Sequence, residues 1–382
     1  MADSERLRRG LVEQFEQSGC LASSAIKRAF LAVPRECFLR EIAEREGLER
    51  VYRDQAIVTR HDARGSPASS SSQPSLMASM LEQLDLVPGH RVLEIGAGTG
   101  YNAALLAEIV GDHGKVVSIE LDPATARDAR GALKHLKSAA TVVCADGREG
   151  HPQDGPYDRI IVTASSPVVP RAWHHQLREG GLLELPLLLA RSGTQIIATL
   201  RRDGPRLRSV ALLHGGFMAL RDAPGAAVAP PAPSMGAVEQ LDGRSRSLAH
   251  LSGRALRSLS QTRRQQLLAL ALSEPRRRPL GLRASRAALG LYLSIQAPPS
   301  RLIGGWPGIG VMSANGDGLA LLAGGRKTFT HIDAYGNRGA EHELLDLVEA
   351  WKTRGRPSIE RLRIQVSFMP KDRSAVRLNW TT

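Results

Sequence analysis

The sequence predicts an α/β protein with a doubly wound, mostly parallel sheet, followed by a second, smaller α+β domain. From about residue 87 onward, short strand-like runs of aliphatic residues alternate with helical patterns, which is typical of a parallel sheet covered by helices. Residues 222–236 are rich in Ala and Pro and show neither a helical nor a strand period, as expected of a semi-stiff linker. A chain of 382 residues is long enough for both domains.

The predicted elements of the first domain follow one another regularly. Helical segments are expected at 7–19 and 22–33, and a loop rich in Ser, Gly and Pro before residue 87. Strand patterns follow at 91–98, 115–122, 140–147, 157–165 and 180–188, and helical patterns lie between them at 101–110, 124–136 and 170–180.

The second part of the chain has a different character. Region 244–290 is rich in Arg and is expected to be helical, most clearly at 257–272. An NGDG turn signal at 315–318 separates two strands, and a further helix is expected at 340–355. The domain boundaries are therefore predicted at 1–222 for the α/β domain, 223–236 for the linker and 237–382 for the α+β domain.

The net charge of +13 is unevenly distributed. Residues 1–230 hold 28 Lys and Arg against 27 Asp and Glu, whereas residues 231–382 hold 23 against 11, a net charge of +12. This field attracts acidic partners, either a nucleic acid or an acidic peptide, although an Arg-rich solubilising surface would have the same composition.

Targeting and cysteine patterns predict a cytoplasmic protein with reduced thiols. The N-terminus lacks the apolar core of a signal peptide, and no apolar stretch is long enough to span a membrane, which predicts a cytoplasmic protein without membrane partners. Cys20, Cys37 and Cys144 are widely spaced and predict neither a disulfide framework nor a metal cluster.

The glycine-rich turn after the strand at 91–95 predicts a cofactor site. Gly96, Gly98 and Gly100 form a GxGxG pattern before a helix, whose N-terminus presents unpaired amides to a ligand. Such turns occur in both dinucleotide and S-adenosylmethionine (SAM) sites. Glu94, inside the strand, is placed to meet the charged amino-acid part of SAM, which favours SAM over NAD.

Two further acidic positions support this prediction. Glu120 ends the next strand, where it can bind both ribose hydroxyls, and Asp146 with Gly147 ends the strand after it, where both can recognise adenine. Doubly wound folds bind ligands at the carboxyl ends of their strands. We therefore expect SAM as the cofactor, S-adenosyl-L-homocysteine as its product, and no metal.

Several motifs together resemble the protein-L-isoaspartate O-methyltransferase family. They are VPRECF at 33–38, LEIGAGTGYNAALLA at 93–107, and ADG at 145–147 followed by YDRIIVTASSPVVPRAWHHQLREGG at 157–181. The resemblance is colinear from Val33 to about Leu220 and does not reach the C-terminal domain. It implies the Rossmann-like fold of class I SAM-methyltransferases and the esterification of an isoaspartyl or D-aspartyl carboxylate.

The resemblance also implies an acceptor site. The TISQP or TISAP loop of the family corresponds to residues 70–74. Ser72 then takes the place of the active-site serine, while Ser70, Ser71 and Leu121 are implied to bind the cofactor. A carboxylate is already ionised at neutral pH and needs no general base, so Ser72 is expected to orient the acceptor by a hydrogen bond.

Departures from the family pattern favour a specialised substrate. TRHDARGSPASSSSQPS at 59–75 replaces a short hydrophobic and glycine segment, Ser75 stands where relatives often carry His or Tyr, and the basic C-terminal domain is additional. These features resemble the family branch that modifies ribosomally made peptides such as lanthipeptides and graspetides. We expect esterification of an aspartyl side chain in a cyclised precursor peptide, with collapse of the ester to aspartimide or isoaspartate and recognition of the peptide by the C-terminal domain.

Three other functions are weighed against this one. A general isoaspartyl repair enzyme is the nearest alternative. A nucleic-acid methyltransferase is disfavoured because only 4% of residues are aromatic, which leaves few platforms for base stacking. A silent peptide-binding scaffold is disfavoured by the intact acids and glycines. No pattern indicates an oligomeric state.

Two histidine-containing segments are expected to have structural roles. His174 and His175 are adjacent in a helical pattern and point about 100° apart, which predicts packing or exposure for each. His331, Asp333 and Tyr335 alternate along a strand and are expected to form ordinary surface, although that strand face could also touch a peptide.

Overall fold

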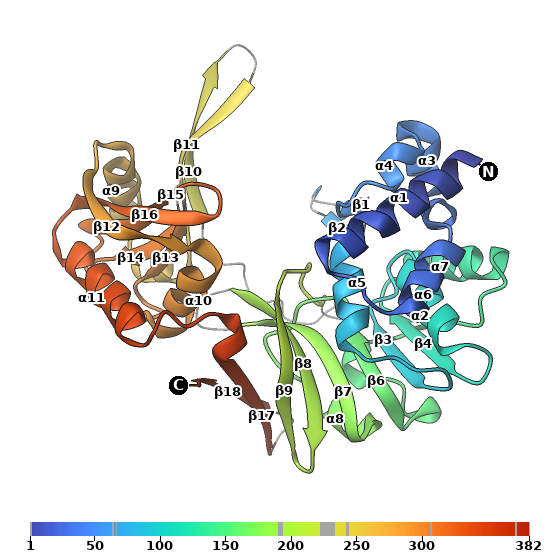
Figure 1. Ribbon diagram of the computed structural model, residues 1–382. Coiled ribbons are helices and arrows are strands. Elements are labelled where there is room, and N and C mark those ends of the chain that lie inside the picture. Colours follow the sequence, from blue (N-terminus) through green and yellow to red (C-terminus); the bar gives the residue numbers. More distant parts are fainter. Residues whose placement is uncertain are drawn as a thin grey trace. The chain divides into compact units, whose positions relative to one another are not determined.

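The chain folds into two compact units. The computed structural model describes residues 2–62, 65, 67–189, 194–221, 234–241, 244–305, 308–370 and 373–381 (Figure 1). The first unit comprises Met1–Leu187, Gln195–Ala227 and Ile364–Arg377, and the second comprises Leu188–Thr194, Val228–Arg363 and Leu378–Thr382.

These boundaries differ from the predicted ones at both ends of the second unit. The C-terminal segment Ile364–Arg377 belongs to the first unit, although 237–382 was predicted to be one domain. Most of the predicted linker, 223–233, lies outside the described residues, and 234–236 already belong to a strand. The returning segment shows no sequence signal for its partner because strand pairing is a long-range contact.

The first unit contains a nine-stranded sheet in the order β18-β17-β9-β8-β7-β6-β3-β4-β5. Its strands are β3 (Arg91–Ile95), β4 (Lys115–Glu120), β5 (Thr141–Cys144), β6 (Tyr157–Val162), β7 (Leu177–Leu188), β8 (Gln195–Asp203), β9 (Arg206–His214), β17 (Leu362–Met369) and β18 (Arg373–Trp380). Strands β3 to β7 pair in parallel, whereas β9 pairs antiparallel with both β8 and β17. The predicted mostly parallel sheet is confirmed, and β3 lies between β4 and β6, where the strand order reverses.

Five helices of nine or more residues pack together on one face of this sheet. They are α1 (Ala2–Ser18), α2 (Ser24–Ala32), α5 (Pro74–Gln83), α6 (Tyr101–Val110) and α7 (Pro123–His135). Their apolar side chains share a buried cluster with Val92, Val116 and Ile161 of the strands. The alternate strand residues Leu93 and Val117 are also buried, so both faces of the sheet are covered, as a parallel sheet requires.

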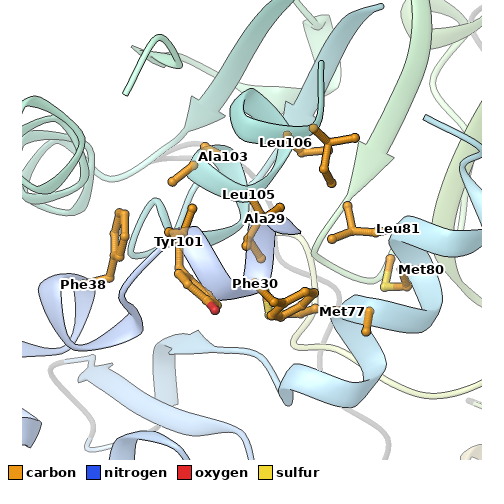
Figure 2. Close-up of a cluster of buried hydrophobic side chains, with 14 of the residues drawn as sticks. Ala29, Phe30, Phe38, Met77, Met80, Leu81, Tyr101, Ala103, Leu105 and Leu106 are labelled. Carbon is orange, nitrogen blue, oxygen red and sulfur yellow. The ribbon is translucent and has the colours of Figure 1, made fainter. Parts of the chain in front are cut away.

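This buried cluster fixes α5 and α6, the two helices that begin beside the predicted site. Tyr101, the first residue of α6, packs between Phe30 of α2 and Phe38, with ring centroids 6.4 Å and 5.5 Å apart (Figure 2). Met77 and Leu81 of α5 belong to the same cluster. Since α5 follows the predicted acceptor loop and α6 follows the glycine turn, this core sets the positions of both loops.

Short elements complete the first unit and correct two predictions. They are η1 (Arg35–Phe38), α3 (Arg40–Glu46), α4 (Leu48–Val51), β1 (Ile57–His61), β2 (Pro67–Ser71), η2 (Gly147–Glu149), η3 (Pro152–Asp154) and α8 (Arg171–Gln176). The Ser-rich region predicted as a loop contains the antiparallel hairpin of β1 and β2. The helix predicted at 170–180 ends at Gln176, because Leu177 pairs with Tyr157 of β6 and this pairing overrides the local helical pattern.

The second unit has the predicted α+β composition. Its antiparallel sheet has the order β10-β11-β13-β14-β15-β16-β12. The elements are β10 (Ser234–Leu241), β11 (Arg244–Ser252), η4 (Arg254–Ser258), α9 (Gln261–Leu272), β12 (Arg276–Ser285), α10 (Arg286–Gln296), β13 (Leu302–Gly305), β14 (Ile309–Met312), β15 (Gly318–Gly324), β16 (Thr328–Gly336), α11 (Gly339–Thr353) and η5 (Ile359–Arg361).

The predicted turn in this unit is confirmed, and the predicted helical region is only partly helical. NGDG connects β14 and β15, where the Ser313 hydroxyl accepts hydrogen bonds from the amides of Asp317 and Gly318. Within 244–290, both β11 and β12 are strands, because pairing with β10 and β16 satisfies their backbone groups. Among the described residues, no helix is both long and apolar enough to cross a lipid bilayer.

Candidate active site

A cavity of about 790 Å³ lies at the carboxyl ends of the parallel strands of the first unit. This volume is within the range of small-molecule sites. Its walls contain ten of the eleven residues predicted for the site, namely Ser70, Ser71, Ser72, Glu94, Gly96, Gly98, Glu120, Leu121, Asp146 and Gly147. The sequence therefore predicted most of the lining of this cavity from four separate segments.

The glycine turn needs its glycines for two different reasons. Gly96 and Gly98 have φ values of 98° and 53°, in the left-handed region that favours glycine. A Cβ on Gly96 would lie 2.5 Å from Thr163 Oγ1. Gly100, predicted to bind the cofactor, does not line the cavity; a Cβ there would lie 3.3 Å from the Cβ of Ala129 on α7. Gly100 thus caps α6 and allows close helix packing.

Glu120 places a carboxylate at the wall formed by the glycine turn. Its side chain is mostly buried and accepts hydrogen bonds from the amides of Gly98, at 3.0 Å, and Asp122, at 3.1 Å. Arg221 approaches the same carboxylate to 3.8 Å. Each carboxylate oxygen has more than one acceptor position, so Glu120 can also accept from the hydroxyls of a ribose.

Asp146 and Gly147 form another part of the cavity wall. The Asp146 carboxylate caps η2 and accepts from the backbone amide and the Nε of Arg148, both at 3.0 Å. A Cβ on Gly147 would lie 2.4 Å from Ile95 Cγ2, and the Gly147 carbonyl accepts from Trp173 Nε1 at 2.8 Å. Position 147 therefore has no room for a side chain, and its backbone lines the cavity.

The Glu94 side chain is more deeply buried than the sequence suggested. It is fully buried, and its two carboxylate oxygens accept from Asn102 Nδ2, at 2.7 Å, and from the Ser118 hydroxyl. Desolvation raises the pKa of Glu94 to about 7, although both hydrogen bonds oppose this change. Its direct contact with a cofactor therefore stays a prediction, while its bonds to Asn102 and Ser118 are part of the fold.

Asn102 is a cavity residue that the sequence reasoning missed. Its Nδ2 donates to Glu94, which leaves Oδ1 as a buried acceptor without a donor among the described residues. A buried acceptor without a partner costs free energy. The ammonium group in the amino-acid part of SAM could donate a hydrogen bond to this oxygen.

The acceptor loop lies directly against the glycine turn. The Ser70 carbonyl is 3.5 Å from the position that a Cβ on Gly98 would take. Arg35 donates to the Ser71 hydroxyl, at 3.1 Å, and to the Ser72 carbonyl, at 3.0 Å. The structure thus brings Ser72 and the predicted cofactor residues into one cavity, although they are separated in the sequence.

Asp54 supports the same loop from its other side. Its carboxylate accepts from the Ser75 amide at 2.8 Å, the Ser75 hydroxyl at 2.7 Å and Gln73 Nε2 at 2.9 Å. Ser75, noted as a departure from the family pattern, therefore serves this capping contact. Arg35 and Asn102 lie inside motifs that carried the family resemblance, whereas no sequence signal marked Asp54.

The remaining candidate residues lie outside the cavity. His174 is buried, with Nε2 2.9 Å from the Gly204 carbonyl and its ring 4.7 Å from that of Phe368, and desolvation lowers its pKa. His175 is exposed. Both observations agree with the predicted structural roles.

The strand in the second unit is less exposed than predicted. Asp333 and Tyr335 are buried, and Asp333 pairs with Arg277 Nε at 3.1 Å and His331 Nε2 at 3.5 Å. Instead of the ordinary surface expected there, the strand holds a buried carboxylate, Asp333, which pairs with the exposed side chain of Arg277. Among the described residues, the three cysteines are free and no group of His, Cys, Asp and Glu forms a metal site.

Comparisons with known proteins place the first unit among carboxyl methyltransferases. A family model described as Protein-L-isoaspartate(D-aspartate) O-methyltransferase matches residues 6–223. A Protein-L-isoaspartate O-methyltransferase from Thermotoga maritima is 41% identical over 186 residues, which are 48% of this chain and 57% of that protein. Its namesake from Methanopyrus kandleri is 39% identical over 184 residues, 48% of this chain and 77% of the relative.

The structural similarity extends further along the chain than the family model. A solved structure titled protein-L-isoaspartate O-methyltransferase aligns with 97% of this chain and 99% of its own, with a TM-score of 0.55 and 26% sequence identity. The region beyond residue 223 therefore has a counterpart in a solved structure with that title.

Proposed function

Because the chain belongs to the protein-L-isoaspartate(D-aspartate) O-methyltransferase family, we propose that it is a protein carboxyl methyltransferase that esterifies isoaspartyl residues with SAM as methyl donor. One observation carries this proposal: Ser70 of the acceptor loop lies against Gly98 of the glycine turn, so the acceptor and cofactor segments share one cavity. Transfer between two bound groups requires such a shared cavity.

The cavity wall has suitable groups for each part of SAM. Glu120 accepts the ribose hydroxyls, while Asp146 and the Gly147 backbone recognise adenine, with Leu121 beside them. Asn102 and the glycine turn receive the amino-acid part. When bound, SAM supplies an electrophilic methyl group on a positively charged sulfur.

The acceptor side suits a group that is already an anion. No His or Lys that could act as a general base is among the described residues that line the cavity. A carboxylate does not need one, since it is ionised at neutral pH. Ser72 orients one carboxylate oxygen toward the methyl group, and the negative charge of the acceptor is neutralised as the ester forms.

The comparisons favour the repair function over the peptide-tailoring function that the sequence suggested first. The named relatives are protein-L-isoaspartate O-methyltransferases, and the solved structure with that title also spans the C-terminal region. An additional C-terminal domain is therefore no sign of a tailoring enzyme. Esterification of an L-aspartate in a modified precursor peptide is a narrower hypothesis, supported only by the Ser-rich acceptor loop.

Ser72→Ala tests the proposed acceptor site. Loss of one hydrogen bond to a charged group should lower kcat on an isoaspartyl peptide about 10–150-fold and leave the affinity for S-adenosyl-L-homocysteine unchanged. Ser79→Ala is the matched control, because among the described residues the Ser79 hydroxyl donates to the Ser75 carbonyl within α5 and to no other group. If Ser70→Ala abolishes turnover while Ser72→Ala does not, the assigned register of the loop is wrong.

Substrate comparison separates the two functions. The repair function predicts methylation of unrelated isoaspartyl peptides and none of their L-aspartyl counterparts. The tailoring function predicts a dedicated L-aspartyl peptide that gains one methyl group and then loses methanol, a net loss of one water by mass spectrometry. A protein that binds SAM and methylates neither class of peptide would contradict both.

A further inference from the structure

Arg35 is a buried cation directly behind the acceptor loop. Its side chain has no exposed surface. The guanidinium donates to the Ser71 hydroxyl, the Ser72 carbonyl and the Val51 carbonyl, at 3.0 to 3.1 Å. Its central carbon lies 5.8 Å from the centre of the Tyr101 ring. Three of these partners, Ser71, Ser72 and Tyr101, line the cavity, so a single residue layer separates the charge from the acceptor.

Among the described residues, no carboxylate is in direct contact with the Arg35 guanidinium, although the charge of Asp54 is close enough to raise its pKa. All acceptors of its guanidinium are uncharged carbonyl or hydroxyl oxygens, and its Nε has no partner among the described residues. The nearby acids bind elsewhere: Asp54 binds Gln73 and Ser75, and Glu36 accepts from the Tyr52 hydroxyl.

Burial of a cation without a carboxylate in direct contact is costly. Desolvation lowers the pKa of Arg35 below its ordinary value, but a guanidinium stays protonated at physiological pH. A neutral amide donor such as glutamine could make hydrogen bonds to the loop without this cost. The positive charge of Arg35 is therefore expected to have a role beyond hydrogen bonding to the loop.

We propose that Arg35 is a positioning residue that supplies the counter-charge for the acceptor carboxylate through the wall of the cavity. The proposal rests on the proposed function, in which the acceptor is an anion that leaves water beside Ser72. Charges interact more strongly in a protein interior than in water, so the guanidinium compensates for lost hydration without touching the substrate. It selects a carboxylate over a neutral amide of the same shape, while its hydrogen bonds fix the backbone of Ser72.

Two substitutions separate the charge of Arg35 from its hydrogen bonds. Arg35→Lys keeps an amine that can carry the charge when it is protonated, whereas Arg35→Gln keeps amide donors and removes the charge. The affinities to compare are those of two peptides that differ only at the isoaspartyl residue, one with its free carboxylate and one with a carboxamide. They are measured by calorimetry on the full chain saturated with S-adenosyl-L-homocysteine. Arg50→Gln is the matched control, because it removes a nearby partly exposed cation on α4.

The expected result is a change in selectivity. The wild-type protein, Arg35→Lys and Arg50→Gln should all prefer the carboxylate peptide, and Arg35→Gln should reduce that preference at least about tenfold. Affinity for S-adenosyl-L-homocysteine should not change. An equal loss of affinity for both peptides in Arg35→Gln would show that Arg35 is only a tether, and would overturn the proposal.

Two further outcomes remain decisive. If Arg35→Gln does not fold, the wild-type protein decides, because equal affinity of the wild-type protein for the carboxylate and carboxamide peptides contradicts the role of the charge. If the wild-type protein prefers the carboxylate peptide but methylates neither, the proposed function fails while the inference about carboxylate selection stands.

Discussion

The buried carboxyl of Glu94 should make the stability of the first unit depend on pH. Its pKa in the folded protein is about 7, because the side chain is fully desolvated, against an ordinary value of 4.5. The folded state therefore holds this proton more tightly than the unfolded chain. The resulting stabilisation is complete below about pH 4.5 and is lost as the pH rises through 7. At about 1.4 kcal/mol per pKa unit, the full effect is about 3 kcal/mol.

Glu94→Gln removes this proton while preserving the local hydrogen bonds. The Gln oxygen can still accept from Asn102, and its amide can donate to the Ser118 hydroxyl, which can act as donor or acceptor. Urea denaturation of both proteins should be measured between pH 5 and pH 8. The difference in unfolding free energy, wild type minus variant, should fall by about 2.5 kcal/mol over this range. Parallel pH profiles for the two proteins would refute the reasoning.

Three further predictions follow from the packing and the cavity. Glu120→Ala should weaken SAM binding about 10–100-fold through loss of a charged acceptor for the ribose; an unchanged Kd by calorimetry would remove Glu120 from the site. Gly147→Ala should destabilise the protein by about 1–3 kcal/mol, because the added Cβ clashes with Ile95. Gly131→Ala is the control: it has open space around it in α7 and should stabilise the protein by about 0.5–1 kcal/mol. Equal melting temperatures of the two variants would contradict this prediction. Truncation after Asp222 removes β17 and β18 from the first sheet, and should lower the melting temperature even with S-adenosyl-L-homocysteine bound; an unchanged melting temperature would show that these strands are dispensable.

The sequence by itself determined the parallel sheet and most of the cavity lining. Strand and helix periods are local patterns, and a glycine turn between a strand and a helix specifies its own backbone geometry. In a doubly wound sheet the carboxyl ends of neighbouring strands meet at one edge. Knowing that Glu120 and Asp146 end successive strands was therefore enough to predict that they line the same cavity.

Only the tertiary structure decided how these residues are held and which others support them. Glu94 is buried and accepts hydrogen bonds from Asn102 and Ser118. Arg35 and Asp54 form hydrogen bonds with the acceptor loop from segments distant in the sequence. The strands in the Arg-rich region, and the return of the C-terminal segment to β9, depend on partners far along the chain. Burial and long-range pairing arise from the whole fold, so no local pattern could specify them.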